Sequence, residues 1–189
     1  MTATLTATEL HTLVDVATRS VEYAVHIHHG WHPDPHEYPT SLQEPGAAFV
    51  TLRLDGRLRG CIGQLVAAEP LVNCVADRAR AAALDDPRFP PVTAGELAFL
   101  EVEVSVLGKP ERFDVADYDD LLRTVRPGVD GLVVEAGSHR ATLLPAVWDD
   151  LPMPIEFVEA LWRKAGLRPG DWPNGIRMSR YTAQLAHGT

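Results

Sequence analysis

The apolar and polar positions near the start of the chain alternate with the period of an amphipathic helix. Apolar residues recur three and four positions apart from Leu10 to Val25, as on the buried face of a helix. Thr6 and Glu9 form a capping box before them, and Gly30 predicts the end of the helix. Residues 30–46 are proline-rich and have no periodicity, which predicts an extended surface loop.

Three later segments are also predicted to be helical. Residues 70–84 begin with a proline that suits a first helical turn and stop before Asp86-Pro87. Residues 154–165 have an apolar face and stop at Gly166. Residues 114–124 are shorter, and their acidic residues suit a helix amino terminus.

Alternation with a period of two predicts the strands. Residues 47–54 and 57–63 flank Asp55-Gly56, which suits a two-residue type I′ turn. A second hairpin joins 131–136 to 139–144, with Glu135 facing Arg140. Residues 100–107 and 176–186 alternate as single strands. Hairpins and separate helices without a repeated βαβ order predict an α+β fold, with a mainly antiparallel sheet and flanking helices.

The composition is that of a globular protein. With 189 residues, 46% hydrophobic and 23% charged, we expect one domain over residues 1–189, with a small subdomain inserted around residues 70–130. No segment approaches the roughly 18 apolar residues of a membrane span. The amino terminus lacks the basic and apolar regions of a secretory leader, so we expect a cytoplasmic protein with free thiols at Cys61 and Cys74. A net charge of -9 argues against nucleic acid or an anionic membrane as the main partner.

The most informative segment for chemistry is Leu58-Arg59-Gly60-Cys61-Ile62-Gly63, the second strand of the first hairpin. Glycine in a strand leaves its neighbour uncovered, so Gly60 and Gly63 suggest that a ligand can approach the sulfur of Cys61 closely.

The hairpin register adds a charge to this interpretation. A two-residue turn pairs Leu52 with Arg59 and Val50 with Cys61, which places Arg59 and Cys61 on the same face of the sheet. A guanidinium in that position favours the thiolate form of Cys61.

Four motifs together resemble the AMMECR domain family over nearly the whole chain. They are the segment 58–63, Asp86-Pro87-Arg88-Phe89-Pro90-Pro91, His139-Arg140-Ala141-Thr142-Leu143-Leu144-Pro145 before Val147-Trp148, and Arg163-Lys164-Ala165-Gly166-Leu167. The resemblance implies an α+β fold with a larger and a smaller lobe. Bacterial and archaeal members are often encoded with, or fused to, a Memo-like protein and a radical SAM protein, which implies a shared pathway with these partners. The family implies no established activity.

Two functions fit these residues. The first is an enzyme that uses Cys61 as nucleophile or acid on a small or peptide-borne anionic substrate, with His139 as the candidate base, because a nucleophilic cysteine needs one. The second is a non-catalytic substrate-binding or adaptor module for the Memo-like and radical SAM partners.

Each candidate residue also has a purely structural explanation. Cys61 then fills space as a small buried thiol, and His139 occupies a hairpin end that histidine suits. Arg59, Arg88 and Arg140 either converge on a carboxylate or phosphate or pair with nearby acids. The pairs would be Arg140 with Glu135 and Arg88 with Asp85 or Asp86.

A histidine-rich segment departs from the family pattern and invites a metal-binding interpretation. It contains His26, His28, His29, His32 and His36. Gly30 and Pro33 interrupt the helix that would align these side chains, and no cysteine or carboxylate set completes a site. We therefore expect no metal, and the absence of a dinucleotide fingerprint, phosphate loop, paired CxxC or serine elbow predicts no cofactor.

Overall fold

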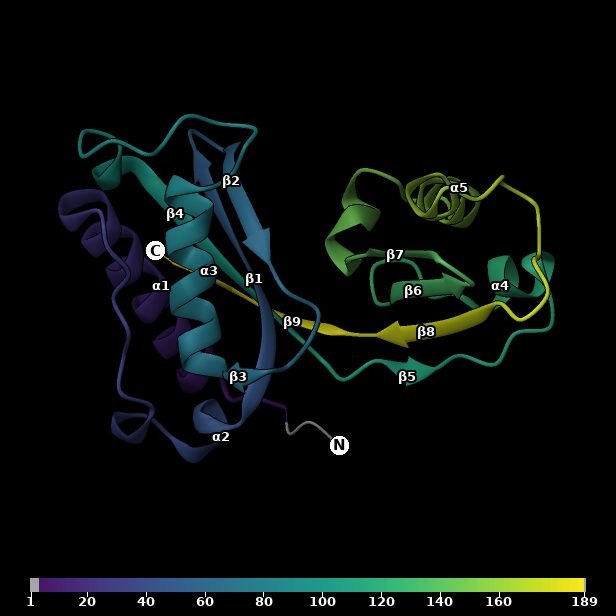
Figure 1. Ribbon diagram of the computed structural model, residues 1–189, viewed down its shortest axis with the longest axis horizontal. Coiled ribbons are helices and arrows are strands. Elements are labelled where there is room, and N and C mark those ends of the chain that lie inside the picture. The colour runs from purple at the N-terminus through teal and green to yellow at the C-terminus, as the bar shows by residue number, and fades with distance from the viewer. Residues whose placement is uncertain (1–3, 189) are drawn as a thin grey trace. The chain divides into compact units, whose positions relative to one another are not determined.

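The computed structural model describes residues 4–188, and the chain forms two compact units (Figure 1). The first unit contains the chain up to Leu107 and the segment from Gln184 onward, and the second is Gly108–Ala183. Each unit has its own hydrophobic cluster. The inserted unit therefore differs from the subdomain expected around residues 70–130, because the helix and strand between 71 and 107 pack into the first cluster. The prediction about a secretory leader concerns the amino terminus, and residues 1–3 of it lie outside the residues that the structure describes.

The helices of the first unit begin and end close to their sequence signals. α1 (Ala7–Ile27) starts at the capping box, in which both reciprocal bonds between Thr6 and Glu9 are present. It ends at Ile27, and its C-cap His28 lies two residues before Gly30. The short helices η1 (Pro35–Glu37) and α2 (Thr40–Gln43) lie within the predicted loop. α3 (Leu71–Leu84) has Pro70 as its N-cap, and η2 (Leu97–Phe99) precedes the next strand. No helix between residues 4 and 188 is long and apolar enough to cross a membrane.

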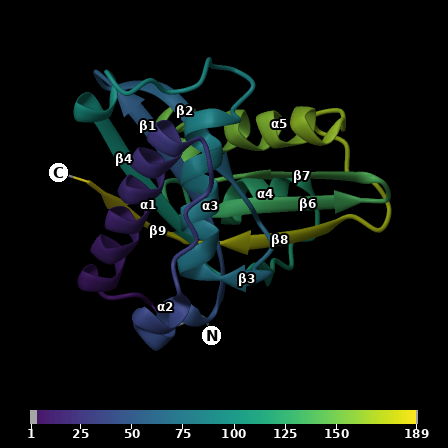
Figure 2. The same cartoon turned by 60° about the vertical axis from the view of Figure 1, so that its left-hand side comes forward.

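The sheet of the first unit is covered by helices on one face. Its strand order is β2 (Arg57–Gly63), β1 (Pro45–Leu54), β4 (Leu100–Leu107) and β9 (Ala183–His187), while β3 (Glu69–Pro70) pairs with the start of β1. The pairs β1–β2, β1–β3 and β1–β4 are antiparallel. α1 and α3 lie side by side over the sheet (Figures 1 and 2). Val50, Leu52 and Val104 are fully buried against these helices.

The second unit is a smaller sheet with one covering helix. Its strand order is β5 (Glu111–Arg112), β8 (Arg177–Tyr181), β6 (Gly131–Ala136) and β7 (His139–Leu143). α5 (Pro154–Ala165) packs on β6 and β7, α4 (Tyr118–Thr124) packs on α5, and η3 (Pro145–Asp149) follows β7. Aromatic rings fill the core, where Trp148 stacks on Phe157 at 3.8 Å between ring centroids and Tyr118 meets Trp162 edge-on at 5.2 Å.

The α+β fold is confirmed, but the last predicted strand is wrong in one respect. Residues 176–186 form two strands in two different sheets, β8 and β9, and not one. Thr182 lies between them and its carbonyl accepts a hydrogen bond from the Gly108 N–H at 2.8 Å, where the chain enters and leaves the second unit. Alternation runs through this point without interruption, so the period alone gives no sign of the change of sheet.

Candidate functional site

A β-bulge in β2 sets the position of Cys61. The Asp55-Gly56 turn has φ values of 51° and 71°, as the predicted type I′ turn requires. Beyond the turn the register shifts, so that Gly60 and not Arg59 opposes Leu52. Arg59 is thus an extra residue in the strand, and everything after it is displaced by one position relative to the predicted register.

The displacement moves Cys61 to the other face of the sheet. Cys61 opposes Thr51, and the predicted pairing with Val50 is wrong, as is the predicted shared face with Val50 and Leu52. Val50 faces the helices, so Cys61 lies on the face that α1 and α3 do not cover. The sulfur is on a half-buried residue and accepts a hydrogen bond from the Thr51 hydroxyl, with 3.4 Å between Oγ1 and Sγ.

Gly60 and Gly63 have packing roles beside Cys61. A Cβ on Gly60 would lie 2.2 Å from the Ala82 carbonyl oxygen, because the backbone of α3 rests directly on β2 at this point. A Cβ on Gly63 would lie 2.1 Å from the ring of Phe49. The missing side chains therefore make room for a helix and a ring, and access of a ligand to the sulfur stays a prediction.

The loop after α3 supplies hydrogen-bond partners for the outward-facing backbone groups of Cys61 in β2. β2 is an edge strand, whose outward backbone groups need partners other than a strand. The Cys61 N–H donates to Oδ2 of Asp86 at 2.8 Å, and Nη2 of Arg88 donates to the Cys61 carbonyl at 3.1 Å. The two side chains thus bind Cys61 as a neighbouring strand would.

Asp86 and Arg88 are also paired with each other. Nε and Nη2 of Arg88 donate to the carboxylate at 2.9 and 2.7 Å, which confirms the predicted pairing of Arg88 within its loop. The carboxylate is 2% exposed, whereas the guanidinium side chain is 54% exposed. The hydrogen bonds from Arg88 hold the pKa of Asp86 well below its usual range, with help from the Cys61 N–H, although burial acts in the opposite direction.

Arg59 fastens the other end of the same loop to β2. Its Nε and Nη2 donate to the two carboxylate oxygens of Glu96 at 2.6 and 3.2 Å, and its Nη1 and Nη2 donate to the carbonyls of Pro90 and Pro91 at 2.9 and 3.1 Å. The bonds from Arg59 lower the pKa of Glu96 to about 2. Because Glu96 neutralises Arg59 and all three nitrogens have partners, Arg59 positions the loop. An effect of its guanidinium on Cys61 stays a prediction.

A row of polar side chains crosses the sheet from Cys61. Thr51 lies between Cys61 on β2 and Glu103 on β4. Glu103 is 14% exposed, and its carboxylate lies 3.5 Å from Nδ1 of His187 and 4.0 Å from Nε of Arg53. Since neighbouring strands are about 4.8 Å apart, His187 on β9 lies roughly 14 Å from β2, too far to act directly as a base on the Cys61 sulfur.

His139 and Arg140 belong to the second unit. Nδ1 of His139 lies 2.8 Å from the Ala165 carbonyl oxygen at the end of α5, so this nitrogen carries a proton. Arg140 pairs with Glu135, with 3.2 Å between Nε and Oε1, as predicted. Both residues thus have structural contacts within their own unit, and a role for His139 as a base for Cys61 stays a prediction.

Cys74 and the histidine-rich segment have unremarkable surroundings. Cys74 is fully buried in the first cluster, and burial raises the pKa of its thiol to about 11. His32 lies 3.6 Å from Asp77, between Nδ1 and Oδ1. Among residues 4–188, no group of three or more histidine, cysteine or acidic side chains has the arrangement of a metal site.

Four residues of this site were not identified from the sequence. They are Thr51, Asp86 as a partner of the Cys61 backbone, Glu96 and Glu103. Finding Thr51 and Glu103 requires the register after the bulge, and finding Glu96 requires the path of the loop. The spacing of Thr93 and Glu96 predicts only a local helix cap. The two residues do bond to each other, with the Thr93 N–H donating to Glu96 Oε2 at 2.8 Å, but η2 has no side-chain cap hydrogen bond.

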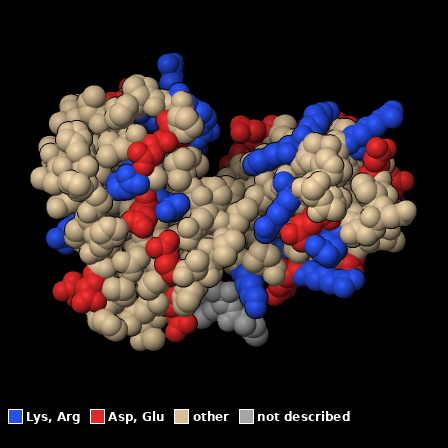
Figure 3. All heavy atoms as spheres, viewed as in Figure 1, with Lys and Arg blue, Asp and Glu red and all other residues tan. Residues whose placement is uncertain are grey.

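Surface charge is mixed on the visible face of the molecule. Figure 3 shows basic and acidic side chains interspersed on both units. With a net charge of -9, the expectation that nucleic acid and membranes are not the main partners stays a prediction.

Comparison with known proteins identifies one family. The family model described as AMMECR1 matches residues 14–186. A protein from Thermofilum pendens is 39% identical, over 96% of this chain and 90% of its own length, and one from Methanothermobacter thermautotrophicus is 41% identical over 81% of each. The crystal structure of an uncharacterised protein from Pyrococcus horikoshii matches with a TM-score of 0.87 at 34% identity, over 96% of this chain and 92% of that one.

Proposed function

This chain belongs to the AMMECR1 family, and from that premise we propose that it is a binding and adaptor module. In this proposal the surface around Cys61 and Arg88 recognises a small or peptide-borne anionic group and presents it to a protein partner. The partners would be the Memo-like and radical SAM proteins whose genes accompany the family. The proposal places the module in the cytoplasm, in keeping with the free thiols of Cys61 and Cys74.

One observation carries the proposal: two of the four family motifs, residues 58–63 and 86–91, hold each other in place around Cys61. Asp86 and Arg88 bind the backbone of Cys61, while Arg59 binds Glu96 and two proline carbonyls. Groups fixed in this way lose little conformational entropy when a ligand binds. A surface that is rigid before binding suits recognition.

The outer side of this surface offers a donor to an anion. Nη1 of Arg88 makes no hydrogen bond with any residue between 4 and 188, whereas its Nε and Nη2 are occupied. Phe89 lies beside the guanidinium, with 5.5 Å from the Arg88 Cζ to the ring centroid. Because Asp86 neutralises Arg88, a ligand would be held by directed hydrogen bonds more than by net charge.

The side chain that hydrogen-bonds to the Cys61 sulfur is a hydroxyl and not a base, which argues against nucleophilic chemistry at Cys61. The hydroxyl of Thr51 is the hydrogen-bond partner of the sulfur, and the nearest histidine along the polar row is His187 on β9. A cysteine nucleophile is normally activated by an adjacent base or a neighbouring cation. Arg88 is such a cation beside Cys61, but Asp86 pairs with it and neutralises its charge. The recognition role therefore fits the geometry better than the catalytic one.

The second candidate function is an enzyme that uses Cys61 on the same anionic substrate. The hydrogen bond from Thr51 Oγ1 to Sγ favours it, because a donor to sulfur stabilises the charged form of a thiol. In that case native Cys61 should react with iodoacetamide at neutral pH about ten times faster than a cysteine in an unstructured peptide, because a larger fraction of it is thiolate.

Arg88→Lys tests the adaptor proposal, with a Memo-like and a radical SAM protein as the partners in the titration. Lysine keeps a positive charge beside Asp86 but lacks the guanidinium fork. Losing one charge-assisted hydrogen bond should weaken the complex by about tenfold or more. The matched control is Arg80→Lys, since Arg80 pairs with Asp85 at 2.8 Å on α3. Equal affinities for the wild type, Arg88→Lys and Arg80→Lys in isothermal titration, or no complex with either protein, would count against the proposal.

A further inference from the structure

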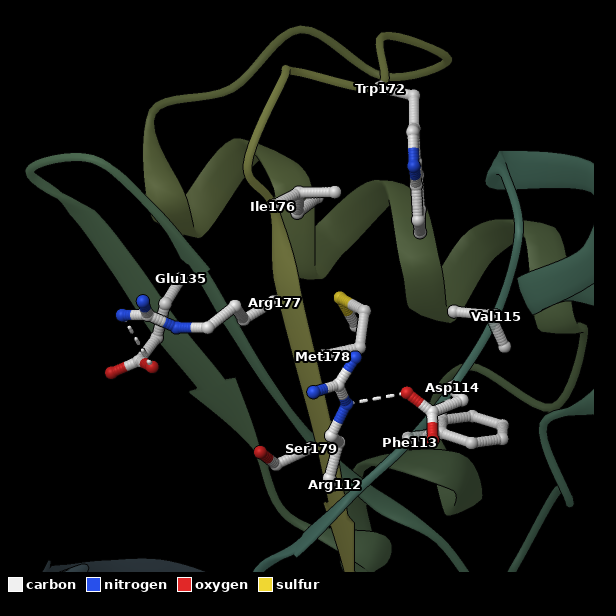
Figure 4. A pocket seen from close by; sticks show the side chains of 10 residues that line it. All are labelled: Arg112, Phe113, Asp114, Val115, Glu135, Trp172, Ile176, Arg177, Met178 and Ser179. Carbon is white, nitrogen blue, oxygen red and sulfur yellow. Dashed lines mark hydrogen bonds and ion pairs between the residues drawn. The ribbon is translucent and has the colours of Figure 1, made fainter.

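The second unit has a pocket where two of its strands part. β5 pairs with β8 through Arg112 and Ser179, and the Phe113 N–H donates to the Met178 carbonyl at 2.9 Å. Beyond Phe113 the two segments of the chain separate and leave a pocket of about 280 Å³ between them (Figure 4). At about 30 Å³ per water molecule, this volume equals roughly nine waters, which suits one small organic molecule.

One side of the pocket is apolar and held rigidly. Trp172, Ile176 and Met178 line it (Figure 4). Trp172 stacks on Trp162 with 6.0 Å between the ring centroids and 21° between the planes. Trp162 is fully buried, and its Nε1 donates to the Asp171 carbonyl at 2.9 Å. The loop that carries Trp172 is therefore fixed before any ligand binds, as a selective site requires.

The other side carries charges of both signs. Arg112 and Asp114 form one pair, with 2.5 Å between Nε and Oδ1, and Arg177 and Glu135 form another, with 3.5 Å between Nη2 and Oε2 (Figure 4). The side chains of Arg112 and Asp114 are 86% and 76% exposed, so their pairing contributes little and rearranges easily. Nη1 and Nη2 of Arg112 make no hydrogen bond with any residue between 4 and 188.

The free end of Arg112 determines which group it can take. Two parallel N–H donors match the two oxygens of a carboxylate. Asp114 lies beside it and offers an acceptor for an ammonium group. Glu135 is shared between Arg177 and Arg140. Arg112 and Asp114 are therefore the pair that can turn to a ligand, and a ligand with both charges can satisfy both of them.

We propose that this pocket binds a small zwitterion with an apolar side chain, of the α-amino-acid type. Its carboxylate lies on Arg112, its ammonium group lies on Asp114, and its side chain packs against Trp172 and Met178. The site is formed by residues 112–115, 135, 172 and 176–179 of the second unit, and the proposal does not depend on the function proposed for the surface around Cys61.

Three related probes separate the contributions of the two charges. L-phenylalanine carries both charges, 3-phenylpropionate lacks the amine, and phenethylamine lacks the carboxylate. We expect L-phenylalanine to bind and to change the tryptophan fluorescence, and each of the other two to bind about tenfold more weakly, because each loses charge-assisted hydrogen bonds. Equal affinities for the three probes in isothermal titration would refute the zwitterion, and no binding of L-phenylalanine at 10 mM or about that concentration would refute the site.

Substitutions then assign the carboxylate to Arg112. Arg112→Gln should reduce the affinity for L-phenylalanine to that for phenethylamine, with the binding of phenethylamine itself unchanged. Arg163→Gln is the matched control, since Arg163 is also exposed and pairs with Glu159 at 2.5 Å but does not line the pocket. A comparable loss in both variants, or undiminished binding in Arg112→Gln, would overturn the assignment. Because Arg112 is 86% exposed, unchanged circular dichroism should confirm that the variant folds.

Discussion

Asp86→Asn is the most sensitive test of the hydrogen bonds that hold the Asp86–Arg88 loop against Cys61 in β2. The Asp86 carboxylate is 2% exposed and accepts hydrogen bonds from the Cys61 N–H and from three nitrogens of Arg88. Asparagine has the same shape, but it carries no charge and turns one NH₂ group toward these donors. The substitution therefore weakens several charge-assisted bonds at once.

The expected loss follows from the burial of the two partners. A hydrogen bond to a charged group contributes about 1.5–3 kcal/mol, and an unsatisfied buried donor costs about 1–3 kcal/mol. Arg88 is 54% exposed, so water replaces part of what it loses. We expect Asp86→Asn to lower the free energy of unfolding by about 2 kcal/mol at pH 7.

The effect should depend on pH with a definite sign. The pKa of Asp86 is lower in the folded than in the unfolded chain, so its stabilising contribution is complete above the unfolded value of about 3.9. It is lost as the pH falls through the folded pKa. The difference between wild type and Asp86→Asn should therefore be constant from about pH 8 to pH 5 and shrink below about pH 4.

Urea unfolding followed by circular dichroism measures this difference, and exchange of the Cys61 amide hydrogen locates it in β2. Asp85→Asn is the matched control, because Asp85 is the preceding residue, is 52% exposed and pairs with Arg80. A surface substitution of this kind should change the unfolding free energy by less than about 0.5 kcal/mol. Equal effects of the two substitutions at pH 7, or a difference that persists unchanged at pH 2, would refute the reasoning.

Two further predictions concern the same strand and its thiol. Gly60→Ala places a methyl group against the Ala82 carbonyl oxygen and should lower the unfolding free energy by about 3 kcal/mol or more, as measured by urea unfolding. The control Gly95→Ala should leave the unfolding free energy unchanged, because a Cβ on Gly95 has nothing within 4 Å. Similar losses in both variants would contradict the packing of α3 on β2. Iodoacetamide at pH 8 should label half-buried Cys61 and leave Cys74 unlabelled until urea is added, because burial raises the pKa of Cys74 to about 11. Peptide mass spectrometry measures the alkylation of each cysteine, and equal alkylation rates for the two in the folded protein would disprove the prediction.

Elements with strong local signals could be predicted from the sequence. The strand at 100–107 and the helix at 154–165 have the predicted bounds, because period, cap and stop signals all agree within each segment. The Asp55-Gly56 turn was predictable for the same reason, since only residues that tolerate positive φ fit a type I′ turn.

The details of the site depend on contacts far apart in the sequence. Arg59, the extra residue of the bulge, bonds to Glu96 and to the Pro90 and Pro91 carbonyls, more than thirty residues away. The role of Gly60 depends on Ala82 in α3. Local patterns carry no information on such contacts, so the sequence located Cys61 but predicted the wrong face of the sheet for it.

The comparison of Cys61→Ser with Arg88→Lys tests most directly whether this surface recognises its ligand or reacts with it. Titration of each variant with the Memo-like and radical SAM proteins gives the affinities. The account predicts that Cys61→Ser binds its partner as the wild type does, because serine keeps the backbone bonds to Asp86 and Arg88, while Arg88→Lys binds about tenfold more weakly or worse. Full affinity in Arg88→Lys, together with a turnover activity of the wild type that Cys61→Ser abolishes, would contradict it.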